Sequence, residues 1–399
     1  MVYNKMSEGD KKLIDRAMRD NKNLHDEKDK MMPVYEDITR YFAPLSARWD
    51  FEHLGDADFG RYIFDGEAIA AMSRMADGLT GWLVSPSIDW IDIEPVKVES
   101  RKNRRLMAYL ELMKNHILEV CASSNFYDAI AQTIADGVGF GTTVIYAHTG
   151  KEIGRPVFEA LPLPECFVSE NRFGEVDLLH REFEMTYRQL FEEFGRDKLE
   201  KLDKDIAKAG DENMEKRVRV LHAIYPRSYP GDTDEAVKLD VEKPFASVYF
   251  YCGESKSSGG YSKPTLVLRE GGLDFKHFEA WRIEKQTGLV YGVSPAMKAL
   301  FDTKMLNLQA KTMADVAQLA ARPPMYSDMS MKGSLKIAPG GISYGVGDQV
   351  PKPIITSLNY PFGIDAMERR AKVIREHFKT DFFMSISQIQ QGGRDRTAT

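Results

Sequence analysis

The chain has 399 residues and 43% hydrophobic content, which is enough to bury sizeable cores in two or three structural units. Its 54 Lys and Arg against 60 Asp and Glu give a net charge of −6, which argues against tight DNA binding through a broad basic face. The sequence has no run of eighteen apolar residues, and residues 1–16 are polar, so we expect a cytosolic protein without export or membrane insertion.

Residues 1–125 are predicted to be helical. Ser7 is placed to cap a helix that extends through about Met31. Helical spacing predicts an apolar face over residues 66–83 that consists of Ile69, Met72, Met75, Ala76, Leu79 and Leu83. The same spacing over residues 101–122 predicts a face of Leu106, Leu110, Met113, Ile117 and Val120. We interpret both stripes as packing surfaces, with methionine filling the core and not lining a pliable groove.

Between Gly141 and Trp281 the apolar period changes from helical to short segments of β-branched and aromatic residues. The candidate strands are TTVIYAH, RPVFEAL, ECFVS, VRVLHAIYP, ASVYFYC, TLVLRE and FEAWRIE. Residues 186–208 insert one or two helices with a heavily charged surface. Because strands and helices do not alternate as βαβ units do, we predict an α+β fold and exclude a doubly wound nucleotide-binding sheet.

Local patterns that invite an enzymatic interpretation are weak. Gly137, Gly139 and Gly141 lie between a helix and a strand, the reverse of the order that aims backbone N–H groups at phosphate. The acidic positions of residues 203–212 fit a solvated helical face better than a two-metal nuclease centre; they are Asp203, Asp205, Asp211 and Glu212. No GxSxG motif occurs, and no cysteine or serine has a base nearby in the sequence. We therefore predict no catalytic residue, no metal site and no cofactor.

Histidine and cysteine are also interpreted structurally. The eight histidines form no HExxH or HxH pair, and we expect His222 and His277 to be hydrogen-bonded histidines within strands. Cys121, Cys166 and Cys252 are odd in number and widely spaced, which predicts buried free thiols and neither a disulfide framework nor a metal site.

A long helix is predicted after residue 294. Ser294 and Pro295 form an N-cap and a first-turn proline, and Arg322-Pro323-Pro324 ends the helix that they open. At 1.5 Å per residue this is a rod of roughly 40 Å. The sequence from Arg322 onward carries 11 Lys and Arg against 7 Asp and Glu, so a modest basic bias follows a more acidic body. This bias fits local phosphate contact, a partner interface or an ordinary solvated surface.

The rest of the chain contains a Pro- and Gly-rich excursion, a second helix and a polar glycine loop. Residues 335–338 and 342–344 are short strand candidates around Pro339-Gly340-Gly341, too few to form a stable sheet without partner strands, although a surface hairpin remains the alternative. Residues 363–383 form an amphipathic helix with Ile364, Met367, Ala371, Ile374 and Phe378 on one face. Its other face carries Arg369, Arg370, Lys372, Arg375 and Lys379.

Over roughly residues 30–399 the chain resembles the portal (head-to-tail connector) proteins of short-tailed double-stranded DNA phages. The motifs that carry this resemblance are NFYDAIAQTIADGVGFGTTVIY, then GLVYGVSPAMKALFDTKMLNLQAKTMADVAQLAARPP, and finally GGRDRTAT. The YGVSP opening and the terminal segment are specific together, whereas DGVGFGT is weak by itself. Proteins of this family form a dodecameric ring at one vertex of the capsid, through which the genome is pumped in and later released.

The resemblance implies a portal fold with five segments. Residues 1–294 would be the wing, helical over 1–140 and mixed over 141–294, and 295–322 the first stem helix, followed by a β-containing clip at 323–360. Residues 361–383 would be the second stem helix, and 384–399 the tunnel loop and the start of the next helix. Family members continue beyond this point with further wing and crown elements, so we expect a truncated form or a missing remainder.

The resemblance also implies residue roles. Stem assembly would involve Leu306, Ala310, Ala314 and Ala317, and docking at the clip would involve Lys332, Lys336, Pro339 and Gly340. The DNA-facing tunnel loop would consist of Ser385, Gln388, Gln390, Gln391, Gly392, Gly393, Arg394 and Arg396. Uncharged polar side chains make weak, exchangeable phosphate contacts and the glycine pair lets the backbone flex, which suits a conduit through which DNA must slide.

The implied partners are further copies of the chain, double-stranded DNA without sequence specificity, the terminase large subunit, major capsid and scaffolding proteins, and tail adaptors. The implied location is the portal vertex of the virion, with the host cytoplasm during assembly. Two alternatives remain open: another phage head-tail adaptor or tail structural protein, and a DNA-processing enzyme. The adaptor would not need the long helix, clip and second helix in sequence, and the enzyme lacks a coherent carboxylate or phosphate-binding constellation.

Overall fold

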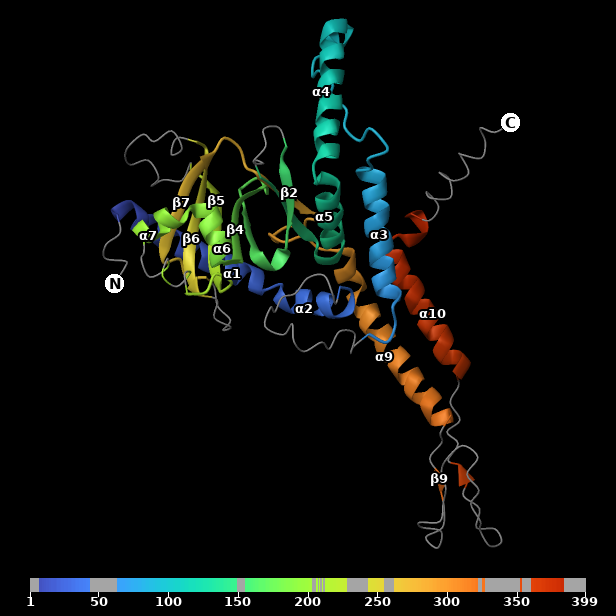
Figure 1. Cartoon of the computed structure of the whole chain (residues 1–399). Coiled ribbons are helices and arrows are strands. Elements are labelled where there is room, and N and C mark those ends of the chain that lie inside the picture. The colour runs from blue at the N-terminus through green and yellow to red at the C-terminus, as the bar shows by residue number, and fades with distance from the viewer. Residues whose placement is uncertain are drawn as a thin grey trace.

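Figure 1 shows the protein as a computed structural model. The structure describes residues 7–43, 63–148, 155–202, 206, 208, 210, 212–227, 243–254, 262–321, 325–326, 352–353 and 360–383. A β-rich body lies at one side of the molecule, and helices project from its other side in two opposite directions (Figure 1). The described chain is an α+β mixture with antiparallel sheets, as the sequence predicts.

The N-terminal third of the chain is helical. Its helices are α1 (Glu8–Asp29), α2 (Met32–Tyr41), α3 (Glu67–Leu83), α4 (Arg104–Ser123) and α5 (Phe126–Phe140), with a 3₁₀ turn η3 (Val98–Lys102) before α4. The predicted cap of α1 is confirmed, because the Ser7 hydroxyl accepts a hydrogen bond of 3.0 Å from the Asp10 backbone N–H. In α3 the fully buried positions are Ala68, Ala71 and Ala76, while Leu83 is exposed and does not belong to the packed face.

The strands form two main sheets. A three-stranded sheet has the order β2-β1-β8, from β1 (Thr142–His148), β2 (Val157–Leu161) and β8 (Phe278–Arg282). A five-stranded sheet has the order β3-β4-β5-β6-β7, from β3 (Cys166–Glu170), β4 (Val176–Thr186), β5 (Arg217–Pro226), β6 (Phe245–Glu254) and β7 (Leu266–Leu273). Every predicted strand in this region is present. Strand β4 was not predicted, because its apolar pattern is broken by His180, Arg181, Glu182 and Glu184.

The central strand β5 is buried on both faces, which explains its nearly continuous apolar sequence. Leu221, Ala223 and Tyr225 pack against Ile14 and Ala17 of α1. Val218 and Val220 lie in a second cluster with helices α6 (Tyr187–Phe194) and α7 (Arg196–Leu202), which cover the other face. A third and larger cluster joins α2, α3 and α5 to the three-stranded sheet and to the helices that follow it.

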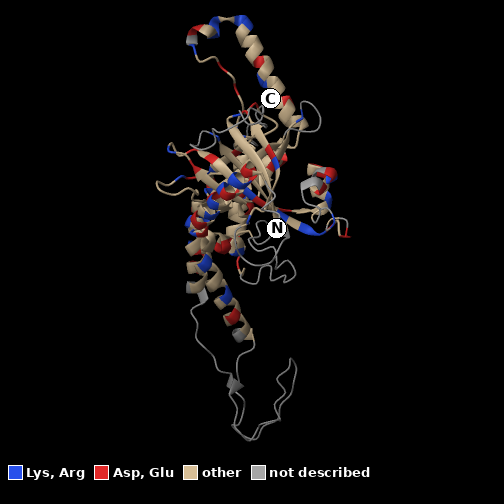
Figure 2. Cartoon of the chain, turned by 90° about the vertical axis from the view of Figure 1, so that its left-hand side faces the viewer, with Lys and Arg blue, Asp and Glu red and all other residues tan. Residues whose placement is uncertain are grey.

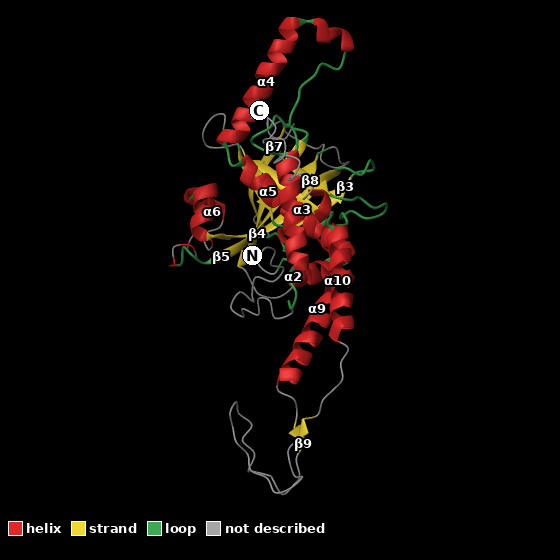
Figure 3. Ribbon diagram, turned by 90° about the vertical axis from the view of Figure 1, so that its right-hand side faces the viewer, coloured by secondary structure: helices red, strands yellow, loops and turns green. Residues whose placement is uncertain are grey.

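The C-terminal part contains helix α9 (Pro295–Ala321), the paired strands β9 (Met325–Tyr326) and β10 (Lys352–Pro353), and helix α10 (Tyr360–His377). The predicted ends of α9 are confirmed: the Ser294 hydroxyl accepts a hydrogen bond of 2.9 Å from the Met297 N–H, and the helix stops before the two prolines. Helices α9 and α10 pack side by side and point away from α4 (Figures 1 and 3).

The prediction of one continuous helix over residues 363–383 is wrong at its end. Helix α10 ends at His377, and Lys379 adopts a left-handed φ of 52° before a further helical turn. Phe378 is fully buried against Phe42 at this break. The change of direction brings the Phe383 ring against Gly78 of α3. The contact is so close that a Cβ at Gly78 would collide with the ring. Burial of aromatic side chains thus overrides the helical pattern.

The histidine and cysteine predictions hold in part. His222 lies in β5, buried, with a ring nitrogen 2.9 Å from the Ser247 hydroxyl. His277 precedes β8 and is not within a strand; its ring contacts Tyr146 and Phe275. Cys121 and Cys166 are buried free thiols, but Cys252 is only partly buried.

Candidate functional site

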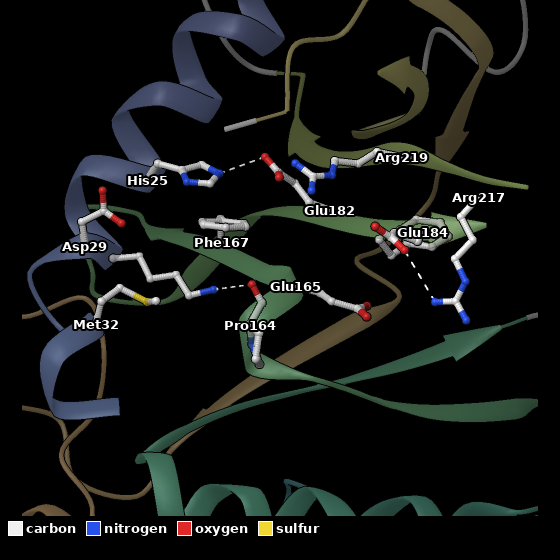
Figure 4. Close-up of a pocket in the computed structure, with 12 residues that line it drawn as sticks. His25, Asp29, Met32, Pro164, Glu165, Phe167, Glu182, Glu184, Arg217 and Arg219 are labelled. Atoms are coloured by element: carbon white, nitrogen blue, oxygen red, sulfur yellow. Dashed lines mark hydrogen bonds and ion pairs between the residues drawn. The ribbon is translucent and has the colours of Figure 1, made fainter. Parts of the chain in front are cut away.

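A pocket of about 280 Å³ lies where α1 meets the five-stranded sheet (Figure 4). Side chains of α1, β3, β4 and β5 and of the 3₁₀ turn η4 (Leu163–Glu165) line it. Lys28 of α1 is fully buried, and its ammonium donates hydrogen bonds to the carbonyls of Leu163 at 2.6 Å, Pro164 at 2.8 Å and Cys166 at 2.9 Å. Burial lowers the pKa of Lys28 to about 7, yet three carbonyl acceptors match the three donors of an ammonium group.

One of the carboxylates that line this pocket, that of Glu182, is also held by hydrogen bonds to its neighbours. Glu182 accepts hydrogen bonds from Asn21 at 2.6 Å and from the Ser262 hydroxyl at 2.6 Å, and it lies 2.9 Å from the His25 ring. Burial acts to raise the pKa of Glu182, but the hydrogen bonds and the charge of His25 outweigh it and hold the pKa at about 2. These contacts fasten α1 to β4, so we interpret the pocket as a structural junction and not a reaction site.

A second, partly buried network joins the two sheets. The Arg181 guanidinium of β4 donates to Glu159 of β2 at 2.6 Å and to Glu165 of η4 at 3.0 Å. The other oxygen of Glu159 lies 2.8 Å from the His148 ring of β1. Two partners for one largely buried guanidinium fix the relative position of the sheets. Within the described ranges, no group of three or more His, Cys, Asp or Glu is arranged to hold a metal ion.

The glycine-rich stretch that follows α5 meets the start of α9. Gly141 caps α5 with a left-handed φ of 80°, and a Cβ at this position would collide with the Gly292 carbonyl. The Ser294 hydroxyl donates to the Gly139 carbonyl at 2.8 Å, and the Gly292 N–H donates to Thr142 at 2.7 Å. The glycines therefore permit a close backbone crossing that positions the long helix. The motifs DGVGFGT and YGVSP were both noted in the sequence, but the contact between them was not predicted.

Helices α9 and α10 form the projecting pair on one side of the body. Met313 packs against Gly363, and Arg370 pairs with Asp302 at 2.9 Å. Phe301 and Leu308 are two turns apart on one face of α9 and are 68% and 57% exposed. Large apolar side chains thus remain uncovered along the rod.

Helix α4 projects in the opposite direction and is the clearest departure from expectation (Figures 1 and 3). The predicted packing stripe includes Met113 and Ile117, which are 39% and 37% exposed, and Tyr109 beside them is 59% exposed. The described residues of α4 that are buried are Lys114 and Cys121. The prediction that this stripe packs therefore holds only in part for the single chain: Leu106, Leu110 and Val120 are partly buried, whereas Met113 and Ile117 are exposed where α4 stands beyond the body.

The C-terminal end of α4, which we call its foot, is nevertheless packed against the body. The Trp90 ring stacks on Phe126 with centroids 5.4 Å apart, and Phe126 meets the Phe158 ring edge-on at 5.0 Å. The Asn125 side chain donates to the Phe158 carbonyl at 2.7 Å and accepts from the Phe158 N–H at 2.9 Å. These contacts anchor the junction between α4 and α5 on strand β2.

Residues 15–399 match the family described as "Bacteriophage head to tail connecting protein". The chain belongs to this family. The connector chain is 27% identical to the "Probable portal protein" of Bordetella phage BPP-1 over 391 residues, which cover 94% of the chain and 66% of that relative. It is 26% identical to the "Portal protein" of Salmonella phage epsilon15 over 386 residues, with the same two coverages.

The connector chain therefore spans 66% of the length of both relatives. No helix among its described residues is long and apolar enough to cross a bilayer. Of the residues assigned to stem assembly, Leu306 is buried in the core of its own chain, Ala310 is partly buried, and Ala314 and Ala317 are exposed.

The other predicted site residues lie outside the described part of the chain. This holds for the docking residues Lys332, Lys336, Pro339 and Gly340 and for the loop residues 385–396. The strand candidates at 335–338 and 342–344 and the acidic positions Asp203, Asp205 and Asp211 also fall outside it. Their roles stay predictions.

Proposed function

We propose that the chain is a subunit of a ring-shaped phage portal through which double-stranded DNA is packaged and ejected. One observation carries this proposal: the family match and both portal relatives extend over nearly the whole chain, from the helical N-terminus through α10. The element order supports it, because a long capped helix is followed along the chain by a second helix that packs back on the first, and the two form one projecting arm. In this proposal residues 1–294 are the wing and α9 and α10 are the stem.

The subunit contacts are proposed to use the uncovered apolar faces, with a second copy of the chain as the occupant. The stripe of α4 and the Phe301–Leu308 face of α9 lie on different parts of the chain, so a contact that uses them is heterologous and repeats from copy to copy. Closure of such a repeat gives a ring, here a dodecamer. Exposed apolar surface of this extent is typical of an interaction surface.

The channel is proposed to lie along the stem and to include the tunnel loop at 384–399. On helix α10, Arg369 pairs with Asp365 at 2.6 Å and Arg370 pairs with Asp302 at 2.9 Å, while Lys372 is exposed. Sparse cations of this kind attract the phosphate backbone without holding it, since strong attraction would stall translocation. The excursion at 323–360 would be the clip, where the terminase large subunit and tail adaptors dock.

The wing would contact the major capsid and scaffolding proteins, at the portal vertex of the virion and, during assembly, in the host cytoplasm. Motor work would belong to the separate terminase, so the chain itself would have no hydrolase activity and no cofactor.

Electron microscopy and native mass spectrometry of the purified chain test the proposal. We expect closed rings with a central hole. A monomer that persists at micromolar concentration would contradict the proposal. Ala314→Asp is the sharper assembly variant, because Ala314 is exposed whereas Leu306 belongs to the chain's own core. Ala314→Asp should leave a folded subunit with reduced ring yield, and Leu306→Asp should lower the yield of folded protein itself.

A further inference from the structure

The end of α4 that is farthest from the sheets carries a dense group of exposed basic residues. We call this group the basic tip; it consists of Lys97, Arg101, Lys102, Arg104 and Arg105. Figure 2 shows basic residues gathered at this end of the molecule. Arg101 pairs with Glu94 at 2.5 Å. Among the described residues, no carboxylate pairs with the other four, although the chain as a whole is acidic.

The position of these charges is unfavourable for the helix itself. Arg104 and Arg105 occupy the first turn of α4, where the helix dipole is positive, and no acidic residue stands in that turn. Helix α1 has the ordinary arrangement, with Glu8 and Asp10 in its first turn and Lys28 in its last. Two cations in the first turn of α4, with no carboxylate in that turn, leave an uncompensated positive charge that favours an external anion.

The side chains of the tip are the groups available to such an anion. The Asn103 side chain already accepts hydrogen bonds from the N–H groups of Arg105 at 3.1 Å and Leu106 at 3.3 Å. The helix also holds the tip roughly 30 Å from its anchored foot, at 1.5 Å per residue. The helix thus holds the cations away from the body, and the tip keeps an excess of positive charge beside its own carboxylates, Glu94 and Glu99.

We infer that the basic tip binds the phosphate backbone of duplex DNA on the side of the ring opposite to β9. The inference rests on the proposed function, in which the motor docks beyond β9 and DNA accumulates on the far side. Repetition in every subunit would make a circle of positive charge there. We commit to duplex DNA as the occupant, because its phosphate backbone is contacted through Lys and Arg side chains alike, and the tip offers both on an exposed surface.

The test compares two triple variants of the full chain with the same charge change. One is Lys102→Glu, Arg104→Glu and Arg105→Glu at the tip; the control is Lys12→Glu, Arg19→Glu and Lys22→Glu on the exposed face of α1. Glutamate in the first turn of α4 suits the helix dipole, so loss of the helix cannot explain an effect. Fluorescence anisotropy with a short labelled duplex is measured across a salt series.

We expect the tip variant to lose about tenfold or more in affinity at low salt and to reduce the salt slope by about 3, one per lost contact. The control should change the slope by less than about 1. Equal losses in both variants, or no duplex binding by the unaltered chain, overturn the inference. A tip variant that binds DNA normally but fails to join capsid proteins overturns it in favour of a protein partner. Electron microscopy of the same samples separates these outcomes from a failure of ring formation.

Discussion

Helices α4 and α5 follow one another in the chain and are equally amphipathic, yet α5 is covered by the rest of the chain and much of α4 is not. Helix α5 buries Ile134, Val138 and Phe140 between α3, α9 and the three-stranded sheet. Helix α4 leaves Tyr109, Leu112 and Met113 exposed. The helical period shows which face of a helix is apolar, but it does not show which chain covers that face. In the proposed ring, the uncovered stripe would be the place where a neighbouring subunit packs.

The largest expected effect comes from matched isoleucines in these two helices. Ile134 is 3% exposed and Ile117 is 37% exposed. Ile134→Ala should cost about 2–5 kcal/mol of unfolding free energy, because it removes buried methylenes and leaves a cavity. Ile117→Ala should cost the single chain less than about 1 kcal/mol and should instead weaken ring assembly. Urea unfolding of dilute subunits measures the first quantity, and ring yield against protein concentration measures the second.

Equal losses of unfolding free energy in the two dilute variants would contradict this prediction. That result would mean that α4 is covered within its own chain. Ile134→Val serves as a milder control in the body, with an expected loss of about 0.5–1.5 kcal/mol.

The sequence could predict features that depend on neighbouring residues, but not those that depend on contacts between distant segments. Local signals placed most strands and both ends of α9, because β-branched runs, an N-cap serine and a double proline act on their immediate neighbours. The β4 strand was missed because its charged residues are satisfied only by distant partners, as Glu182 is by Asn21 and Ser262. The crossing of Gly141 and Gly292 likewise depends on segments about 150 residues apart, as the Gly292–Thr142 hydrogen bond records. The roles of the loop and clip residues came from family resemblance and stay predictions.

A pH effect of intermediate size is expected from Glu182 of β4. The folded-state pKa of Glu182 is about 2, below its ordinary value of 4.5, so its contribution is complete above pH 4.5 and is lost as pH falls toward 2. This contribution is about 3 kcal/mol at one pKa unit per 1.36 kcal/mol. Glu182→Gln should be less stable at pH 7 and should lose less of its remaining stability between pH 4.5 and 2.

The control for this effect is Glu119→Gln, since Glu119 is exposed on α4. Urea unfolding at several pH values between 2 and 7 measures both variants. A Glu182→Gln protein whose stability falls with acid as steeply as the unaltered chain would show that the contacts with His25, Asn21 and Ser262 do not fasten α1 to the sheet.

The smallest effect on the single chain, and the most informative about assembly, is expected from Tyr109→Ser combined with Met113→Ser. Both side chains lie one turn apart on the uncovered stripe, so their loss should change the unfolding free energy of a dilute subunit by no more than about 0.5 kcal/mol. In the proposed ring the same change would remove apolar contact at every subunit boundary, and ring yield should shift to higher protein concentration. Native mass spectrometry across a dilution series measures this shift. Rings that form at the original concentration would exclude the α4 stripe as a subunit contact and leave the Phe301–Leu308 face of α9 to hold the ring together.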